Sequence, residues 1–143
     1  MKYTKIREVK TPNRGSYESA GLDFFIPKGL GIEVGAGNSE LVPSGIKANI
    51  PEGTMFQVCN KSGRAVKGLI VGACIIDSDY QGELMFNVWN ISTGTIKIEE
   101  GEKLVQLVLV PILLPTLIEV KEEDLFSATT SRGDGGFGST GVN

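Results

Sequence analysis

Residues 69–90 read LIVGACIIDSDYQGELMFNVWN, which is two apolar runs separated by a polar segment that contains glycine. The runs, Leu69–Ile76 and Leu84–Asn90, are rich in β-branched and aromatic residues, and Asp77–Glu83 between them has the composition of a turn. Two short runs joined by such residues are typical of a β-hairpin. The stretch therefore predicts two paired strands.

The same rhythm recurs along the chain, where short apolar runs are bounded by Gly, Pro, Asn, Asp or Ser. The other runs are Lys2–Val9, Gly45–Ile50, Met55–Cys59, Thr95–Ile98 and Lys103–Val110. A helical period is not sustained over a dozen residues, and only a short helix near Ser62–Val66, with Ser62 as its N-cap, is expected. The pattern predicts an all-β sandwich or barrel with at most one short helix.

Composition narrows the possible functions. A chain of 143 residues with 41% hydrophobic residues is expected to form one domain with one core. The 14 basic and 17 acidic residues give a net charge of −3, which argues against a surface that neutralises nucleic acid. There is no histidine, so Ser-His triads and His-ligated zinc are excluded. Acid–base chemistry must fall to Asp, Glu, Lys or Tyr.

The cysteines and the apolar segments bear on the cellular compartment. Cys59 and Cys74 lie in apolar runs, which favours reduced core residues of an intracellular protein. The N-terminus lacks the apolar region of a signal peptide, and the most apolar stretch, Lys103–Val120, is interrupted by a glutamine and two prolines. We therefore expect no membrane span, and a cytoplasmic protein or an intracellular viral product.

The C-terminal residues differ from the rest. After Phe126 the chain reads SATTSRGDGGFGSTGVN, with 5 glycines in residues 132–141. Such a segment buries too little apolar surface to offset its ordering entropy, so we expect a domain of residues 1–126 and a mobile arm of residues 127–143. The arm is either a terminus without function or a segment that closes over a nucleotide. An arginine suits phosphate and a phenyl ring can lie on a base.

Four polar positions are candidates for chemistry. Asp77 follows an apolar strand and either serves turn geometry or, partly withdrawn from water, acts as a base toward a water molecule. Residues 60–68, NKSGRAVKG, place three cations around a Ser-Gly step that would suit phosphate, although a Walker sequence is missing. Asp23 is uninformative by itself. Gln106, inside an apolar strand, needs a backbone or ligand partner.

Five segments in this order resemble the five motifs of the trimeric dUTPases, or dUTP diphosphatases. They read AGLDFFIP, NKSGRAVKG, GACIIDSDYQGELMFNVWN, GEKLVQLVLVP and RGDGGFGSTG, and extend from Ala20 to Gly141. The resemblance implies a jelly-roll β-barrel and a homotrimer with shared active sites. It also implies Mg²⁺-dependent hydrolysis of dUTP to dUMP and pyrophosphate, which keeps uracil out of DNA and supplies dUMP for thymidylate synthesis.

The resemblance also implies residue roles. Asp77 would activate the water that attacks the α-phosphorus in line, and Asp23 would hold Mg²⁺ through water. Contacts to the base and sugar would come from Cys74, Tyr80, Met85 and Phe137, with Tyr80 under the deoxyribose. Contacts to the phosphates would come from Lys61, Ser62, Gly63, Gln106, Arg132, Gly138, Ser139 and Thr140. Lys61 stands where the family usually has arginine, and Cys74 where glycine is common.

Two other functions are compatible with a similar fold. A dCTP deaminase is the nearest enzymatic alternative, but the glycine-rich arm and the Asp-x-Asp-Tyr step at residues 77–80 favour the hydrolase. A non-catalytic jelly-roll trimer that acts in assembly or binds a regulatory protein is the alternative from another class. Such a module has no need of Asp77, Tyr80 and the arm together.

Overall fold

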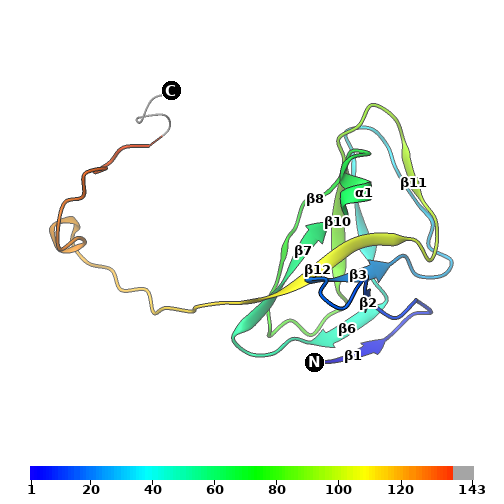
Figure 1. Ribbon diagram of the computed structural model, residues 1–143, viewed down its shortest axis with the longest axis horizontal. Coiled ribbons are helices and arrows are strands. Elements are labelled where there is room, and N and C mark those ends of the chain that lie inside the picture. The colour runs from blue at the N-terminus through cyan, green and yellow to red at the C-terminus, as the bar shows by residue number, and fades with distance from the viewer. Residues whose placement is uncertain (137–143) are drawn as a thin grey trace. The chain divides into compact units, whose positions relative to one another are not determined.

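In the computed structural model, which describes residues 1–136, the chain divides into a unit Met1–Leu113 and a second unit from Leu114 (Figure 1). The strands of the first unit are β1 (Lys2–Lys5), β2 (Asn13–Arg14), β3 (Gly21–Phe25), β4 (Ile32–Val34), β5 (Ser39–Pro43), β6 (Ile46–Asn49), β7 (Thr54–Asn60), β8 (Leu69–Val71), β9 (Ile75–Ile76), β10 (Met85–Asn90), β11 (Ile96–Ile98) and β12 (Lys103–Pro111). Its helix is α1 (Ser62–Ala65). The predicted all-β class with one short α-helix is confirmed for the described residues.

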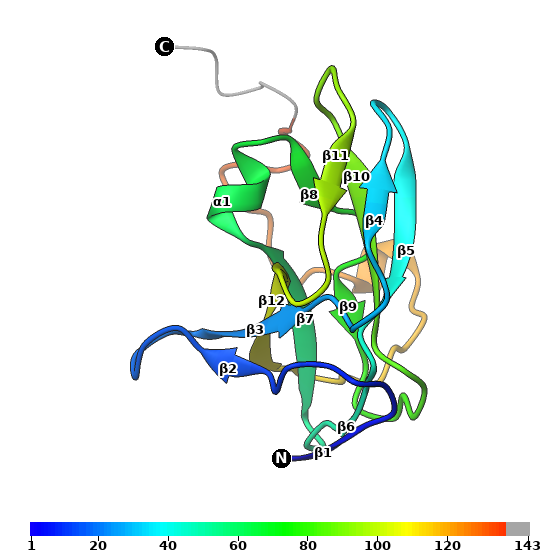
Figure 2. The ribbon, with the colours of Figure 1, turned by 90° about the vertical axis from the view of Figure 1, so that its right-hand side faces the viewer.

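The strands form four sheets (Figure 2). The largest has the order β2-β3-β12-β7-β9, so β12 lies at its centre and pairs antiparallel with both β3 and β7. A second sheet has the order β5-β10-β8, and β1-β6 and β11-β4 form two-stranded sheets. The class is that of the expected jelly roll, but the ladders remain four separate sheets and do not close into one continuous barrel.

The core lies between the two larger sheets. Leu107 of β12, Phe56 of β7 and Phe86 of β10 are almost completely buried. Phe24 and Phe86 meet edge to face, with ring centroids 5.5 Å apart and planes at 80°. Because burial of each large apolar side chain contributes about 2 kcal/mol, this cluster supplies much of the stability that holds the site-bearing strands.

The predicted hairpin is only partly present. The run Leu69–Ile76 is divided into β8, which pairs with β10, and β9, which pairs with β7 in the other sheet. The division falls at Gly72, where a Cβ atom would lie 2.2 Å from Asn87 Oδ1 and 2.5 Å from Trp89 Nε1. Only glycine lets the backbone pass this close to β10. The run was therefore wrongly predicted as one strand.

The short helix lies where the sequence predicts it, but its start differs. Lys61 is the N-cap, with an extended backbone (φ −80°, ψ 126°), and no side chain caps the helix. The prediction of Ser62 as the N-cap was wrong, since Ser62 is already the first helical residue. The helix end is fixed by backbone hydrogen bonds, including Val66 N to Ser62 O at 3.1 Å.

Residues 114–136 of the second unit contain one 3₁₀ turn, η1 (Glu122–Asp124). The apolar side chains that this unit leaves exposed are those of Leu114, Leu117, Ile118, Val120, Leu125 and Phe126. The predicted boundary between residues 126 and 127 stays a prediction. Among the described residues there is no helix with the length and apolar character needed to cross a membrane.

Candidate active site

The segment between β9 and β10 borders an open cavity of about 190 Å³. The cavity is lined by Ile75, Ile76, Asp77, Tyr80 and Met85. Asp77 follows β9 directly and Met85 begins β10, so pairing of β9 with β7 and of β10 with β5 fixes the two sides. The structure therefore brings Asp77, Tyr80 and Met85 together. Asp77 is exposed in the single chain, and the expectation that the strand withdraws it from water was wrong.

Tyr80 is held by its own segment. Its amide donates to Asp77 O at 3.3 Å, which closes a turn, and its hydroxyl donates to Glu83 O at 2.9 Å. The ring lies over Gly82, where a Cβ atom would come within 2.3 Å of the hydroxyl oxygen. The turn role of Asp77 and its place at the cavity thus coexist, because the same turn presents the carboxylate and the ring.

A second polar cluster, which we call the lysine cluster, consists of Asp23, Lys61 and Lys103. Asp23 lies in β3, and its side chain is only 3% exposed. Lys61 Nζ donates to Oδ1 at 2.6 Å, and Lys103 Nζ lies 2.7 Å from Oδ2 without the angle of a hydrogen bond. Burial alone would raise the pKa of Asp23, but contacts with Lys103 and Lys61 outweigh it and hold that pKa below its ordinary value.

A bulge in β12 places Lys103 in this cluster. Gln106 lies opposite Asp23 in the ladder, so the two side chains share a face of the sheet. Strict alternation would put residue 104 on that face as well, but the register shifts between Lys103 and Val105. The extra residue turns Leu104 into the core and aims Lys103 at the carboxylate of Asp23.

Gln106 has the backbone partner that its position in an apolar strand requires. Its Nε2 donates to Asn60 O at 2.9 Å, at the end of β7 and directly before Lys61. The side chain lies over Gly21, where a Cβ atom would come within 2.4 Å of Gln106 Oε1. Glycine at position 21 of β3 thus leaves room for the amide, which bonds on the β7 side next to Lys61.

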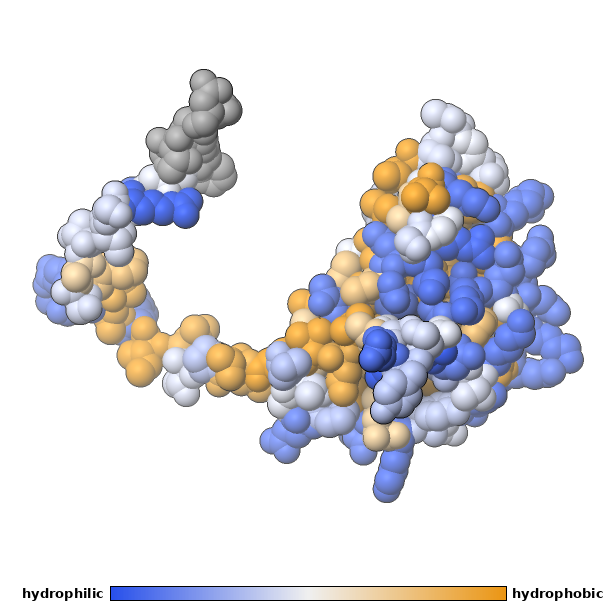
Figure 3. Space-filling model, viewed as in Figure 1, coloured by the Kyte–Doolittle hydropathy of each residue, from blue (hydrophilic) through white to orange (hydrophobic). Residues whose placement is uncertain are grey.

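Beside the lysine cluster lies a cavity of about 340 Å³. It is lined by Lys61, Gly63, Arg64, Lys67, Glu102 and Lys103. Arg64 pairs with Glu102 at 3.1 Å and donates from Nε to Lys103 O at 3.1 Å, which joins α1 to the start of β12. Figure 3 shows hydrophilic side chains over α1, β3 and the start of β12. Four cations face two carboxylates here, Glu102 in the lining and Asp23 beside it, and the remaining positive charge suits a polyanion such as a phosphate chain.

The two cavities lie toward opposite ends of β7. Phe56 pairs with Ile76, so Asp77 lies beside Met55, whereas Lys61 follows the other end of the strand. Positions 55 and 61 are six residue steps apart, which at about 3.3 Å per step is a distance of roughly 20 Å. A single chain therefore does not bring Asp77 and the lysine cluster together.

A family model described as dUTPase matches residues 7–141. This chain belongs to the dUTPase family. Deoxyuridine 5'-triphosphate nucleotidohydrolase of Yarrowia lipolytica is 40% identical over 136 residues, covering 94% of this chain and 84% of the relative. The enzyme of that name from Candida albicans is 39% identical over 142 residues, covering 99% and 87%. The chain is thus a hydrolase of nucleotide metabolism.

Solved dUTPase structures have the same fold as this member of the family. A mutant of the Staphylococcus bacteriophage 80alpha dUTPase with dUpNHpp aligns with a TM-score of 0.88 at 26% identity, covering 99% of this chain and 98% of that chain. A mutant dUTPase from phage phi11 of S. aureus, described with a structural Mg(II) ion, aligns with a TM-score of 0.77 at 26% identity, covering 85% and 96%.

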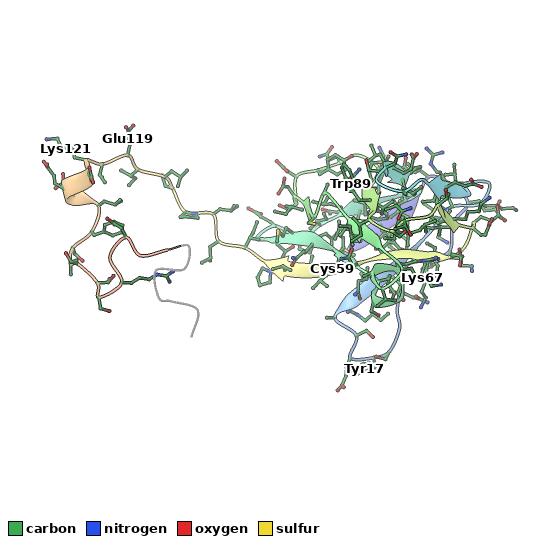
Figure 4. The ribbon with its side chains drawn as sticks, turned by 90° about the horizontal axis from the view of Figure 1, so that it is seen from above. Tyr17, Cys59, Lys67, Trp89, Glu119 and Lys121 are labelled. Atoms are coloured by element: carbon green, nitrogen blue, oxygen red, sulfur yellow. The ribbon has the colours of Figure 1, made fainter. Side chains whose placement is uncertain are left out.

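The cysteines of this dUTPase are free but are not core residues, so that prediction was wrong. Cys59 lies on β7 (Figure 4), and both cysteine residues are partly exposed. Burial, together with the neighbouring Cys74, raises the pKa of the Cys59 thiol. Cys74 O accepts from Val58 N at 2.7 Å, so the backbone at the expected base site is held against β7.

Only part of the predicted C-terminal arm lies within the residues that the structure describes. Of the predicted arm, Arg132 is exposed, and its Nε donates to Gly135 O at 2.8 Å. The predicted roles of Phe137, Gly138, Ser139 and Thr140 fall outside the described residues. Sequence reasoning counted Arg64 among three cations that would suit phosphate but gave it no role of its own, and it did not single out Lys103. Their positive charges, each within a quoted motif, were the available signal.

The loop before Asp23 is rigidified locally. The guanidinium group of Arg14 donates to the carbonyl groups of Ser19 and Ala20, which fixes the chain as it enters β3. Tyr17 at the tip of this loop is 99% exposed, and Figure 4 shows its side chain projecting from the β2–β3 loop. The loop thus anchors the strand that carries Asp23.

The lysine cluster offers a single carboxylate, that of Asp23, which would suit a magnesium ion held mainly by substrate phosphates and water. Asp23 Oδ2 is buried, lacks a hydrogen-bond partner and pairs with the ammonium group of Lys103 at 2.7 Å, so Lys103 would have to move aside before this oxygen could hold a hydrated cation. Within residues 1–136 no three His, Cys, Asp or Glu residues gather as a protein cage. Mg²⁺ commonly binds through one or two carboxylates together with substrate phosphates and water.

Proposed function

We propose that this dUTPase hydrolyses dUTP to dUMP and pyrophosphate at sites formed between copies of the chain. The separation of two complementary cavities along β7 carries the proposal. One holds an acidic side chain and an aromatic ring of the kind that a nucleoside and an attacking water require. The other holds the positive charge that a triphosphate requires.

Asp77 is the proposed general base. Its exposed carboxylate borders the cavity with Tyr80, so it can accept a proton from a water molecule placed in line with the α-phosphorus. Tyr80 packs under the deoxyribose, where a ribose 2′-hydroxyl would not fit. Backbone groups near Cys74 and Met85 meet the uracil edge. Cytosine would leave such buried groups unpaired, at a cost of about 1–3 kcal/mol for each.

The phosphate chain binds at the lysine cluster. Lys61, Ser62 and Gly63 lie at the start of α1, and Gln106 is held next to them through Asn60 O. Their donors and charges would orient the triphosphate and offset its negative charge. Asp23 would hold Mg²⁺ through water, and the bound ion would supply further charge neutralisation on the phosphates.

Sharing between copies follows from the distance of roughly 20 Å along β7 between Asp77 and Lys61. The α-phosphorus is part of the phosphate chain, so a base at one end of the strand cannot serve phosphates bound at the other end of the same strand. A second copy, placing its Asp77 cavity against the lysine cluster of the first, completes a site. We propose a homotrimer, in which the exposed apolar side chains of residues 114–126 are covered by another copy.

The C-terminal arm, residues 127–143, is proposed to close over the bound nucleotide. Arg132 would contact the phosphates. Phe137 would stack on uracil, and Gly138, Ser139 and Thr140 would contact the terminal phosphates. Because ordering the arm costs entropy, closure requires base and phosphate contacts together, which couples recognition of the base to exclusion of water.

Pyrophosphate release from dUTP, UTP, dTTP and dCTP with Mg²⁺ tests the activity. We expect turnover of dUTP alone, and its loss in Asp77→Asn with nucleotide binding retained. Deamination of dCTP, or an unreactive protein that fails to bind dUTP, would contradict the proposal.

Complementation tests the sharing of sites. Asp77→Asn and Lys61→Ala chains, each inactive alone, are unfolded together and refolded as mixed trimers. Some mixed sites then combine an intact Asp77 with an intact Lys61 from another chain, so activity returns. The matched control mixes Asp77→Asn with the Asp77→Asn/Lys61→Ala double variant, which contains no intact Asp77. Absence of recovery in the first mixture, with trimers demonstrably mixed, would refute shared sites.

A further inference from the structure

We propose that Glu83, held by Arg7, is a positioning residue that fixes Tyr80 and thereby sets the discrimination between deoxyribonucleotides and ribonucleotides. The inference deepens the proposed function and rests on the role of Tyr80 given there. It concerns residues outside the catalytic contacts, since Glu83 and Arg7 act through the ring and do not touch the nucleotide.

The ring of Tyr80 depends on Glu83 for its orientation. Its hydroxyl donates to Glu83 O at 2.9 Å, and the residue is 42% exposed. Gly82 leaves the space into which the hydroxyl fits, since a Cβ atom there would lie 2.3 Å from it. An exposed ring held at its tip moves when the carbonyl group that holds it moves.

The Glu83 side chain is fixed by three donors. Arg7 donates from Nε at 3.0 Å and from Nη2 at 3.3 Å, and Gly45 N donates to Oε1 at 2.7 Å. The Glu83 side chain is 16% exposed. Burial alone would raise its pKa, but the hydrogen bonds from Arg7 and Gly45 outweigh it and lower the pKa below its ordinary value. The side chain is therefore a charged anchor at neutral pH.

The surrounding backbone makes this anchor rigid. Leu84, next to Glu83, donates to Ile46 O at 2.9 Å and accepts from Ser44 N at 3.0 Å. Ile6 N donates to Gly45 O at 2.8 Å, which brings Arg7 to the same place. Gly45 has φ +73°, a conformation that favours glycine, and a Cβ atom there would lie 3.0 Å from Arg7 Cβ. The N-terminal segment thus reaches the Tyr80 turn through Gly45 and Glu83.

Loss of the Glu83 side chain is expected to weaken the discrimination against a ribose more than it slows the hydrolysis of dUTP. Glu83→Ala removes the partner of Arg7 and Gly45 N, so the 80–84 turn gains freedom while Asp77 keeps its place after β9. A ring that can shift admits a 2′-hydroxyl, and we expect kcat/KM for UTP relative to dUTP to rise about tenfold. The kcat for dUTP should change less than about threefold.

The experiment measures kcat and KM for dUTP and UTP in the wild type, Glu83→Ala, Glu83→Gln and Arg7→Met. Glu83→Gln retains an oxygen for Gly45 N and Arg7, so it should keep most of the discrimination. Glu33→Ala, which breaks the exposed pair of Glu33 with Lys97 elsewhere on the surface, is the matched control. Trimer size and thermal stability are recorded for each, so that a folding defect is recognised.

The outcomes distinguish a failure of the proposed sugar contact of Tyr80 from a failure of the positioning role of Glu83 and Arg7. A wild type that turns over UTP as well as dUTP would refute the sugar role of Tyr80 itself. If the wild type discriminates against UTP, and folded Glu83→Ala and Arg7→Met show the same ratio of kcat/KM for UTP to that for dUTP as the wild type, the positioning role alone is refuted. If Glu83→Ala does not fold, Arg7→Met and Glu83→Gln decide the question, because both keep the side-chain volume. The proposal is supported if kcat/KM for UTP relative to dUTP rises in Arg7→Met and stays close to the wild-type ratio in Glu83→Gln.

Discussion

Lys103→Met in the lysine cluster should destabilise the protein by about 2 kcal/mol. The ammonium group lies 2.7 Å from Asp23 Oδ2. At that distance an effective dielectric constant of about 20 gives a gross attraction of roughly 6 kcal/mol. The net loss is smaller, because Lys103 is 45% exposed and Lys61 still holds the carboxylate. It remains larger than for a surface pair, since the carboxylate is almost completely buried.

The coupling within the cluster sharpens this prediction. Removal of both lysines leaves Asp23 buried without a counter-charge, so the Lys61→Met/Lys103→Met double variant should lose more than the sum of the single losses. Asp23→Asn in that double background should restore part of the lost stability, because it removes the unpaired charge. The same Asp23→Asn change in the wild type should be destabilising.

Urea unfolding followed by the fluorescence of Trp89, the single tryptophan, measures these free energies. All variants are compared at one chain concentration, since assembly adds to stability. Lys97→Met, at an exposed ion pair, is the control and should change stability by less than about 0.5 kcal/mol. A Lys103→Met protein as stable as that control would refute the electrostatic reasoning.

The pH dependence gives an independent check. The pKa of Asp23 is held below its ordinary value, so the cluster contributes stability that is present above about pH 4 and is lost as the pH falls through the lowered pKa. The wild type should therefore lose stability steeply in acid, and Lys103→Met less steeply. Parallel curves for the two proteins would contradict the prediction.

Three further predictions concern the core, the phosphate contacts and the arm. Leu107→Ala, at a side chain with no exposed surface, should cost about 3 kcal/mol in urea unfolding; a loss below 1 kcal/mol would mean that the centre of β12 repacks. Lys61→Arg should lower the KM for dUTP because a planar guanidinium group contacts phosphate at two points, and steady-state kinetics would show an unchanged or higher KM if the pocket is adapted to lysine. Truncation before Arg132 should keep the trimer in size-exclusion chromatography and abolish dUTP hydrolysis, and a full rate would exclude the closing role.

The strands that the sequence predicts are those with long apolar runs. The run Lys103–Val110 corresponds to β12, and Met55–Cys59 to β7, because their alternate residues are buried in the core. The run Lys2–Val9 yields only β1, since its partner strand β6 begins at Ile46 and the backbone turns at Gly45, where φ is +73°. Run length therefore predicts strands, but their ends depend on partners that are distant in sequence.

The strand β3 was missed for a different reason. Its sequence GLDFF contains a carboxylate in the middle, which local pattern reasoning treats as a break. The charge is tolerated because Lys61 at the start of α1 and Lys103 on β12 pair with it, and a bulge that composition does not reveal aims Lys103. Tertiary contacts thus override the local preference.

The candidate site was predictable as motifs but not as geometry. The order of the motifs indicated Asp77, Tyr80 and Asp23 as site residues. That Asp77 and Asp23 lie near opposite ends of β7 follows from strand register, which one sequence does not give. The break at Gly72 has the same origin, since it reflects the approach of β10. The pair of Arg7 with Glu83 joins residues 76 positions apart and carries no local signal.

The proposed placement of the base at one end of β7 and of the phosphate pocket at the other has a genetic consequence. An isolated chain would be inert, so dilution below the assembly threshold would switch the enzyme off without any change in its residues. In a mixed population, a chain lacking Asp77 would spoil one pocket of its trimer, whereas a chain damaged at both ends of β7 would spoil two. Alleles with lesions at opposite ends of the strand would partly rescue one another, and alleles with lesions at the same end would not.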